Sequence, residues 1–292
     1  MQNNKVVLIV VDALRFDTAC THMGFMQHLV ERKIAARYKV CSEVPSLSRP
    51  LYETILTGTP PIVHGVTSNM TVRLSTQNSL FHLAKENGLT TAAAAYYWVS
   101  ELYNRAPFMH MEDRLQLDTQ LPIENGLFYF EDHYPDSHLF ADAAWLMDQK
   151  QPDFLYIHPM NVDDDGHKFT ADSAQYRNRV LAVDALLSLF IPKCLAQGYE
   201  VIVTADHGMT SDGNHGGTTV EDRHVPMFVM SKRVKAGIKD EIVSQLQIAP
   251  LCCYLLGIEP SDEMVSLLLE GVQSLKKSLV CMKYSRLVQG QG

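Results

Sequence analysis

The stretch Val201-Ile202-Val203-Thr204-Ala205-Asp206-His207-Gly208 decides the fold that we expect for this chain. Its apolar run predicts a buried strand, and the polar residues follow at the point where that strand ends. A carboxylate beside an imidazole at a strand end indicates a metal site at the carboxyl edge of a sheet, because oxygen and nitrogen ligands together favour zinc, manganese or a similar divalent ion. A second imidazole follows nearby, in Asn214-His215-Gly216-Gly217.

Outward from this stretch, short apolar runs alternate with helical patterns, as in βα units around a sheet. The predicted strands are Val6–Val11, Ala36–Val40, Thr91–Tyr96, Phe154–His158, Val201–Thr204 and Met227–Met230. The predicted helices are Gly24–Arg32, Arg49–Leu56, Leu80–Glu86, Asp136–Gln149, Asp172–Ala196 and Leu251–Ile258. Because the strand runs are apolar on both faces, we predict an α/β fold whose mostly parallel central sheet is covered by helices on both faces.

The chain shows no internal repeat and no low-complexity linker, which favours a single domain over residues 1–292. Residues 99–135 are rich in aromatic residues, Met, Asn and Pro without a clean period, and predict a small cap or substrate-covering insertion. The segment that closes at Gly292 is mixed in character, and its last four residues look frayed.

Composition indicates an ordinary soluble protein, with 46% apolar and 20% charged residues. A formal net charge of −8 argues against a nucleic-acid-binding surface, which is normally basic. The six cysteines show no CxxC spacing and look like reduced residues of a cytosolic protein. The run Val6–Val11 is too short to span a membrane and lacks a signal-peptide cleavage region. We therefore expect a cytoplasmic protein with no membrane or nucleic-acid partner.

Two further candidates for chemistry lie at the ends of predicted elements. Asp12 follows the first strand, where ligands bind in open α/β sheets, although a lone Asp there would usually cap a turn. Ser48 precedes Arg49-Pro50 and is explained well enough as a helix N-cap. A hydroxyl at a helix N-terminus also meets N–H donors that stabilise an alkoxide and a phosphate, and the same argument is weaker for Ser46 and Ser42.

An acidic run, Asp163-Asp164-Asp165-Gly166-His167, follows the strand Phe154–His158 and is predicted to be a loop. The spacing of Asp163 and His167 lets both reach one ion, while a solvated acidic turn is the alternative. Three Asp and three His thus follow predicted strands, which fits two metals with about three protein ligands each, roughly 4 Å apart.

Five stretches, in this order, resemble the alkaline phosphatase superfamily and most of all its nucleotide pyrophosphatase/phosphodiesterase branch. They are Val-Asp-Ala-Leu-Arg-Phe-Asp (11–17), Pro-Ser-Leu-Ser-Arg-Pro (45–50), Leu-Thr-Gly-Thr-Pro-Pro-Ile-Val-His-Gly (56–65), Asp-Asp-Asp-Gly-His (163–167) and Ala-Asp-His-Gly-Met (205–209). The Ser-Arg-Pro and Asn-His-Gly-Gly-Thr-Thr stretches are also similar to the luminal domains of glycosylphosphatidylinositol ethanolamine-phosphate transferases.

The resemblance implies an alkaline phosphatase-like fold and a role for each matching residue. One metal would be held by Asp12, Ser48, Asp206 and His207, and the other, which activates water, by Asp163, His167 and His215. Ser48 would attack phosphorus and give a phospho-enzyme intermediate, and Asn69 would donate to a phosphoryl oxygen. Zinc is the expected metal at both sites, with manganese as the alternative.

Some positions depart from the branch or have rivals. The branch commonly places Thr where this chain has Ser48. His224, before Val225-Pro226, competes with His215 for the last ligand position. Arg49 either contacts phosphate or pairs on the helix surface, and we favour the surface, while Arg15 and Lys168 are expected to be structural or to support the ligands.

We therefore predict a two-metal phosphohydrolase acting on a small phosphate ester, most of all a phosphodiesterase. Phosphomonoester or phosphonate hydrolysis, and transfer to an alcohol in place of water, are alternatives within the superfamily. The lack of membrane spans counts against the lipid-anchor transferase role, and an inactive metal-binding homologue is the non-enzyme alternative. An aromatic set either stacks on a planar leaving group or fills the core: Tyr96, Tyr97, Trp98, Tyr103, Phe108, Phe128 and Tyr129.

Overall fold

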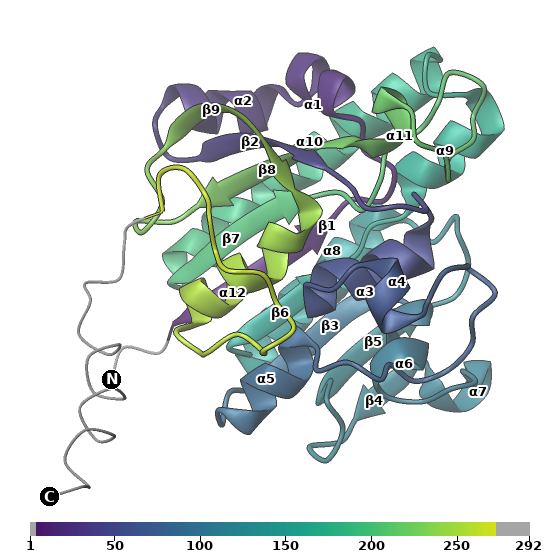
Figure 1. Cartoon of the computed structure of the whole chain (residues 1–292), viewed down its shortest axis with the longest axis vertical. Coiled ribbons are helices and arrows are strands. Elements are labelled where there is room, and N and C mark those ends of the chain that lie inside the picture. Colours follow the sequence, from purple (N-terminus) through teal and green to yellow (C-terminus); the bar gives the residue numbers. More distant parts are fainter. Residues whose placement is uncertain (1–3, 273–292) are drawn as a thin grey trace, which may run out of the picture.

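Nine strands form one sheet in the computed structural model, which describes residues 4–272 (Figure 1). The order across the sheet is β4-β5-β3-β6-β1-β7-β8-β2-β9. The strands are β1 (Lys5–Val10), β2 (Ala36–Cys41), β3 (Thr91–Tyr96), β4 (Leu115–Leu117), β5 (Asn125–Tyr129), β6 (Phe154–Ile157), β7 (Tyr199–Thr204), β8 (His224–Met230) and β9 (Gly237–Ser244).

The centre of the sheet is parallel, as predicted. Strand β1 pairs in parallel with β6 on one side and β7 on the other, and β3 pairs in parallel with β6 and β5. Only two strands run against this direction: β4 is antiparallel to β5, and β8 is antiparallel to both β7 and β2. The carboxyl ends of β1, β6 and β7 therefore meet at one edge.

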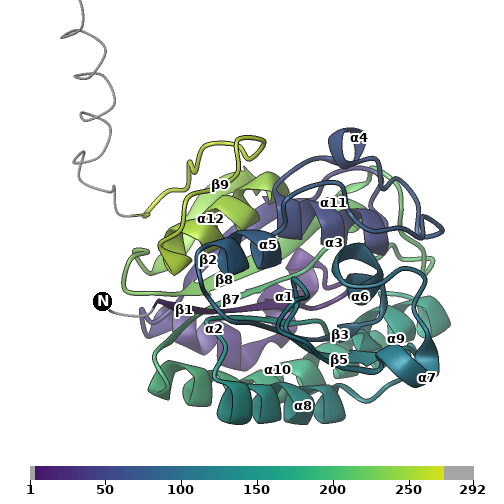
Figure 2. The same ribbon diagram turned by 90° about the horizontal axis from the view of Figure 1, so that it is seen from below.

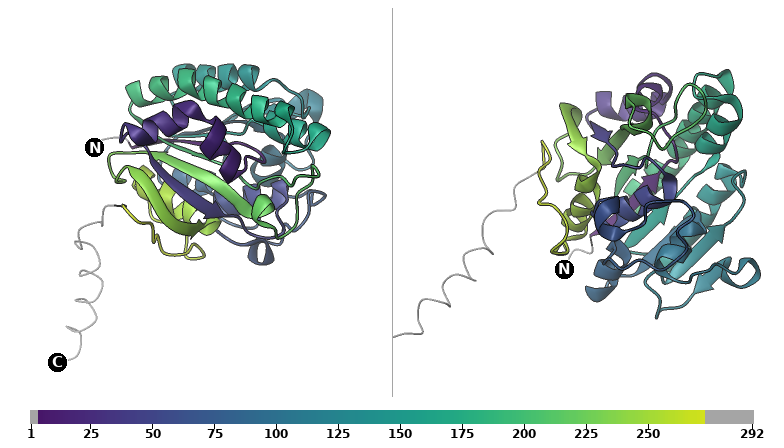
Figure 3. Two further views of the ribbon diagram at one scale, coloured as in Figure 1. Left: turned by 90° about the horizontal axis from the view of Figure 1, so that it is seen from above. Right: turned by 45° about the vertical axis from the view of Figure 1, so that its right-hand side comes forward.

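Helices cover both faces of the sheet. On one face α8 (Asp136–Lys150) packs on β3 and β6, and α10 (Ala174–Ala196) packs on β7 and contacts α1 (Phe16–His22) and α2 (Gly24–Glu31). On the other face α12 (Ile248–Leu256) packs on β1 and contacts α3 (Ser48–Thr57) and α5 (Leu80–Glu86). These two layers lie above and below the sheet in Figures 2 and 3.

Shorter elements complete the described chain. They are α4 (Pro61–His64), α6 (Trp98–Tyr103), α7 (His110–Asp113), α9 (Asn161–Phe169), α11 (Val220–Arg223) and the 3₁₀ turn η1 (Gln245–Gln247). Among residues 4–272, no helix combines the length and the apolar character that a membrane crossing needs.

Strand composition explains the two covered faces. All six residues of β1 except Lys5 are buried, and all six of β3 are buried, four of them alanines. A run without polar alternation has no face to offer to water, so helices must cover both sides. The fold class predicted from these runs is confirmed.

Three predictions about elements were wrong. The strand predicted to begin at Met227 begins at His224. It runs through Pro226, which lies opposite Lys39 of β2, although a proline is uncommon inside a sheet. Strand β9 was not predicted, since its residues are mostly exposed. The acidic run predicted as a loop is helix α9, where Asp163 and Asp164 lie in the first turn and favour the positive end of the helix dipole.

The region 99–135 takes part in the sheet. Its residues 125–129 form β5, paired with β3, and 115–117 form β4 at the edge. A substrate-covering role for the rest of this region stays a prediction. The expectation about the segment that ends at Gly292 concerns residues outside the described range.

Candidate metal centre and nucleophile

Three buried polar residues follow three adjacent strands at the carboxyl edge. Asp12 lies two residues beyond the end of β1, His158 directly follows β6, and Asp206 lies two residues beyond the end of β7. Since β1 lies between β6 and β7, the three side chains converge. All three are fully buried.

The first group of candidate ligands is Asp12, Asp206 and His207. The Nε2 atom of His207 lies 3.4 Å from Oδ1 of Asp12 and 3.2 Å from Oδ2 of Asp206. The other oxygen of Asp206 accepts a hydrogen bond from the backbone N–H of Ala13 at 3.2 Å. One oxygen of each carboxylate therefore points at the same imidazole nitrogen.

The second group is Asp163, His167 and His215. Asp163 and His167 lie one turn apart on α9, and their Oδ1 and Nε2 atoms are 3.4 Å apart. His215 brings its Nε2 atom to 3.7 Å from the same oxygen of Asp163 and to 3.2 Å from Nε2 of His167. The rings of His215 and His207 stack with centroids 3.9 Å apart, so the two groups lie against one another.

Backbone carbonyls set the tautomer of every histidine in the two groups. Nδ1 donates to the oxygen of Gly208 in His207, of Gly213 in His167 and of Ser46 in His215, at 2.8 to 2.9 Å. Because a carbonyl can only accept, the proton belongs on Nδ1 and the lone pair on Nε2. The three lone pairs face the carboxylates, which is the arrangement that a cation requires.

The carboxylates themselves leave one oxygen each without a donor. Within residues 4–272, the buried atoms Asp12 Oδ1, Asp206 Oδ2 and Asp163 Oδ1 accept no hydrogen bond. A buried carboxylate oxygen without a donor is unfavourable unless a cation compensates it. These three oxygens are also the atoms that face the imidazole Nε2 atoms, so the donor set fits divalent metal ions.

Electrostatics support the same interpretation. Burial and the charge of Asp12 raise the pKa of Asp206 well above its usual range, and burial with Asp12 and Asp132 does the same for Asp163. Burial and the neighbouring His215 lower the pKa of His207 to about 3. His207 is therefore neutral, and burial makes the ionised form of the neighbouring carboxylates unfavourable. The site lacks positive charge, which bound cations would supply.

Ser48 contacts the first group. It is the first residue of α3, and Leu47 rather than Ser48 occupies the N-cap position, so the predicted capping role is wrong. Its Oγ lies 3.0 Å from Nε2 of His207. The weaker candidates are Ser46 and Ser42, whose hydroxyls donate to the backbone oxygens of Gly217 and Asp206, respectively.

Asn69 lies beside the same helix end. Its side-chain oxygen accepts a hydrogen bond from the backbone N–H of Arg49 at 3.0 Å and so satisfies one of the free donors of the first turn of α3. This contact holds the carboxamide of Asn69 beside Arg49, the residue after Ser48. Its role toward a phosphoryl oxygen stays a prediction.

Arg49 is not a surface residue, so our preferred interpretation was wrong. Its side chain is buried, pairs with Glu101 at 2.7 Å and donates to the backbone oxygen of Thr71 at 2.9 Å. The guanidinium also lies over the ring of Trp98, 4.6 Å from its centroid. The ion pair joins α3, which begins with Ser48, to α6, and the hydrogen bond to Thr71 joins it to the loop that carries Asn69.

Two residues that support Asp12 were missed. The Nε2 atom of His158 lies 3.1 Å from Oδ2 of Asp12, and the hydroxyl of Tyr52 donates to the same oxygen. These donors leave Oδ1 facing His207. The signal was present for His158, which follows a buried strand as Asp12 does, but we had included it in the strand. Tyr52 gave no such signal, because it lies within an apolar helical pattern.

Glycines let the loops approach one another. A Cβ atom on Gly208 would collide with the backbone oxygen of Glu221. A Cβ atom on Gly166 would lie 2.7 Å from the Cε of Met209. Gly208 therefore lets its loop lie against the backbone of α11, and Gly166 lets α9 lie against Met209 of the Asp-His-Gly-Met stretch.

Other candidates lie outside the two groups. His224 begins β8 opposite Cys41 and belongs to neither group. Asp164 pairs with Lys168 and Asp165 with Arg179, which fits supporting rather than ligating roles. Arg15 pairs with Asp17 and Asp172.

Most of the aromatic set fills the core. Five of its rings are buried, and only two are partly exposed, Tyr97 and Trp98. A stacking role for the buried rings is therefore excluded by packing, and it stays a prediction only for the remaining two.

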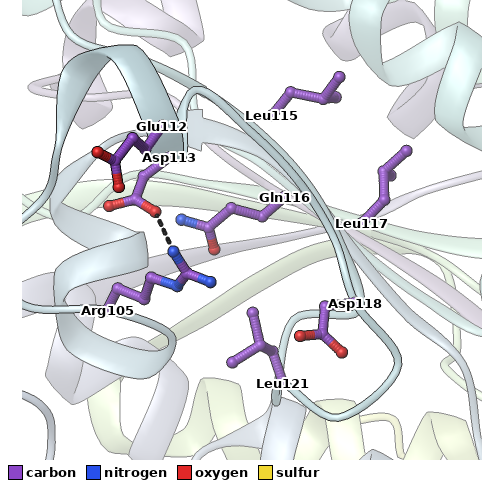
Figure 4. Close-up of a pocket in the computed structure, with 8 residues that line it drawn as sticks. All are labelled: Arg105, Glu112, Asp113, Leu115, Gln116, Leu117, Asp118 and Leu121. Atoms are coloured by element: carbon purple, nitrogen blue, oxygen red, sulfur yellow. Dashed lines mark hydrogen bonds and ion pairs between the residues drawn. The ribbon is translucent and has the colours of Figure 1, made fainter.

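A separate cavity of about 250 Å³ lies beside β4 (Figure 4). Arg105 and Asp113 lie side by side in its lining and form an ion pair at 3.0 Å. Leu115, Gln116 and Leu117 line another side, and none of the lining residues belongs to the two ligand groups.

The chain was compared with known families and structures. Residues 6–224 match the family described as type I phosphodiesterase / nucleotide pyrophosphatase. Murine ectonucleotide pyrophosphatase / phosphodiesterase 5 has a similar fold, with a TM-score of 0.71 at 13% identity over 90% of this chain and 97% of that chain. The alkaline phosphatase PafA is similar, with a TM-score of 0.68 at 13% identity over 94% of this chain and 99% of that chain.

Curated relatives carry a different description. GPI ethanolamine phosphate transferase 3 of Saccharomyces cerevisiae is 26% identical over 79% of this chain and 23% of its own length. The catalytic subunit of human GPI ethanolamine phosphate transferase 2 is 22% identical over 92% of this chain and 28% of its own length. The chain thus spans about a quarter of the length of these relatives.

Proposed function

The chain belongs to the type I phosphodiesterase / nucleotide pyrophosphatase family of the alkaline phosphatase superfamily, and from this we propose that it is a phosphodiesterase that uses two divalent cations and Ser48 as its nucleophile. Asp12, Ser48, Asp206 and His207 would hold one cation. Asp163, His167 and His215 would hold the other.

One observation carries the proposal. Three buried carboxylate oxygens without a donor face three imidazole lone pairs, in two groups that lie against one another, and Ser48 Oγ contacts the first group. A structural cluster would satisfy its oxygens with N–H or O–H donors. In this cluster such donors reach only the far oxygens: His158 and Tyr52 bind Oδ2 of Asp12, and the backbone N–H of Ala13 binds Oδ1 of Asp206.

The chemistry follows from the positions of these side chains. When bound, two cations would neutralise the charge on the serine oxygen and on the phosphoryl oxygens. Ser48 Oγ would lose its proton and attack phosphorus, and the bond from phosphorus to the leaving alcohol oxygen would break. The leaving alcohol would take up a proton, and Ser48 would carry a phosphate that is still esterified to the second alcohol. The Asn69 carboxamide, fixed by Arg49, would donate to a phosphoryl oxygen. Water would then release phosphate monoester from Ser48.

The donor set favours zinc, because each group combines imidazole nitrogen with carboxylate oxygen at a site with only three or four protein ligands. Manganese would accept the same donors. Metal analysis of the purified chain is expected to find about two divalent ions per molecule, and dialysis against a chelator is expected to abolish hydrolysis until zinc or manganese is returned.

Transfer to an alcohol is the second candidate, and the named curated relatives favour it, since they are ethanolamine phosphate transferases. In this case Ser48 would carry an ethanolamine phosphate group. An acceptor hydroxyl would then take the place of water in the second step.

Rates measured side by side test both candidates. An aryl phosphodiester, an aryl phosphomonoester and an aryl sulfate should be compared, with and without an added alcohol acceptor. The proposal expects the diester to be cleaved fastest, by about a hundredfold or more over the sulfate. A product that carries the added alcohol would favour transfer. A metal-loaded protein that cleaves none of the phosphate esters would overturn both.

A further inference from the structure

The residue that follows Asp12 has a strained backbone. Ala13 has a φ of 58°, in the left-handed region that residues other than glycine rarely adopt. Its side chain is fully buried, and its N–H donates to Oδ1 of Asp206 at 3.2 Å. A strained conformation of this kind persists only where the surrounding groups hold it. The strain therefore lies in the turn that joins the two carboxylates of the first group of candidate ligands.

The hydroxyl of Tyr176 spans this turn. It donates to the backbone oxygen of Ala13 at 2.6 Å and accepts from the backbone N–H of Arg15 at 3.1 Å. The Arg15 guanidinium also pairs with Asp172 at 3.2 Å, but the Asp172 side chain is 66% exposed, and an exposed ion pair contributes little. Tyr176 is fully buried, so its two hydrogen bonds are shielded from water.

Two other contacts hold the backbone just before the turn. The N–H of Val11 donates to the backbone oxygen of Thr204 at 2.8 Å, and the N–H of Asp12 donates to that of Pro159 at 3.0 Å. These bonds extend the pairing of β1 with its neighbours as far as Asp12. The Tyr176 hydroxyl holds the backbone that follows, where the chain leaves the sheet.

The helix that carries Tyr176 is itself well supported. Tyr176 lies in the first turn of α10, where its N–H donates to the hydroxyl of the N-cap residue Ser173 at 3.1 Å. Helix α10 packs on β7, which leads to Asp206, and contacts α9, which carries part of the second group. The hydroxyl therefore joins the turn after Asp12 to a helix that contacts the supports of both groups.

We propose that Tyr176 is a positioning residue for the first group of candidate ligands. Its hydroxyl holds Ala13 in the left-handed conformation, and the N–H of Ala13 fixes Oδ1 of Asp206. The other oxygen, Oδ2, then stays 3.2 Å from Nε2 of His207, where a cation would bind. The inference rests on the proposed function, because it concerns the cation of this group. A tyrosine that only filled the core would need one partner for its hydroxyl, and not two in the turn beside a candidate ligand.

Zinc affinity tests the inference. Tyr176→Phe removes the hydroxyl and keeps the ring. Competition with a chelator should show that one of the two zinc ions is bound about tenfold more weakly than in the unchanged chain, because a group that orients a ligand is lost.

The matched control is Tyr199→Phe. Tyr199 is also buried, and its hydroxyl donates to the backbone oxygen of Pro152 at 2.7 Å, at the end of β7 that lies away from Asp206. Each variant loses one buried hydroxyl, so their unfolding free energies should fall by similar amounts. Only Tyr176→Phe should lose zinc affinity.

Hydrogen exchange separates the inference from the proposed function. In the metal-free chain, the Ala13 amide should exchange about tenfold faster in Tyr176→Phe than in Tyr199→Phe, because the turn opens more easily. NMR measures this rate. Equal exchange at Ala13 in the two variants, or equal affinity in a chain that binds zinc, would overturn the inference. An unchanged chain that binds no zinc would refute the proposed function, while faster exchange at Ala13 would still establish Tyr176 as the support of the turn.

Discussion

The hydroxyl of Ser48 lies 3.0 Å from Nε2 of His207, although 159 positions separate the two residues in the chain. The serine is first in α3, and the histidine follows the buried strand β7. Because the proton of His207 is held on Nδ1 by the oxygen of Gly208, Nε2 can only accept. The Ser48 hydroxyl therefore donates toward the group of ligands, and its oxygen is already placed where a nucleophile would be needed.

Ser48→Ala should lower the rate of aryl diester hydrolysis by about a thousandfold or more, because the nucleophile is removed. Ser46→Ala is the matched control, since the hydroxyl of Ser46 is used on the backbone of Gly217. Initial rates and metal content would be measured for both. A Ser48→Ala protein with normal rates and normal metal would rule out this nucleophile.

His215→Ala should remove one of about two bound cations and most of the activity, because His215 completes the group with Asp163 and His167. His224→Ala, in the rival histidine, should keep both cations. Elemental analysis after gel filtration gives the comparison directly. Loss of a cation from the His224 variant alone would transfer the ligand position to that residue.

Tyr52→Phe should lower the affinity of the first group for its cation by about tenfold or more, because the hydroxyl that orients the Asp12 carboxylate is lost. Competition with a chelator of known affinity measures this change. Tyr38→Phe serves as control, since its hydroxyl donates to the backbone of Glu270 instead. Equal chelator curves for the two variants would contradict the orienting role.

Glu101→Gln should destabilise the protein by about 3 kcal/mol, because it leaves the buried guanidinium of Arg49 without its counter-charge. Arg49→Met with Glu101→Gln should recover part of that loss, since no charge then remains buried. Denaturant unfolding of the two variants at one metal concentration gives the difference. A double variant no more stable than Glu101→Gln alone would contradict the argument.

Stability should fall as pH rises from about 4.5 to about 7 because of Glu53. Burial raises the pKa of this carboxyl from 4.5 to about 7, against hydrogen bonds from Ser75 and Tyr103 that lower it. The folded state therefore binds the proton more tightly, so the contribution is complete below pH 4.5 and is lost by about pH 7. The loss amounts to about 3 kcal/mol. Glu53→Gln should show no such decline in unfolding free energy between those pH values, and a parallel decline in the variant would assign it to other groups.

The sheet could be predicted because its strands are apolar on both faces, as in β1 and β3. Burial on both faces leaves little room for another structure. Strands β4 and β9 could not be predicted, since they lie at the edges of the sheet and their residues are largely exposed. Helix α9 was hidden by its acidic run, which is typical of a loop until the i,i+4 pair of Asp164 and Lys168 is counted.

Part of the candidate site could likewise be predicted from the sequence, and part could not. Asp12 and Asp206 could be located because each follows a buried strand of the parallel centre. The burial of Arg49 could not be predicted, because its partner Glu101 lies on a separate helix and no local pattern joins them. The support from Tyr52 depends likewise on a contact across the fold.

Both groups of candidate ligands combine early and late parts of the chain, a feature that also bears on synthesis. Asp12 is synthesised long before Asp206 and His207, and Asp163 and His167 of α9 are synthesised before His215. A growing chain on the ribosome thus carries neither complete group until His207 and His215 have been made. A cation that needs all the ligands of the first group would therefore bind only after β7 has paired with β1.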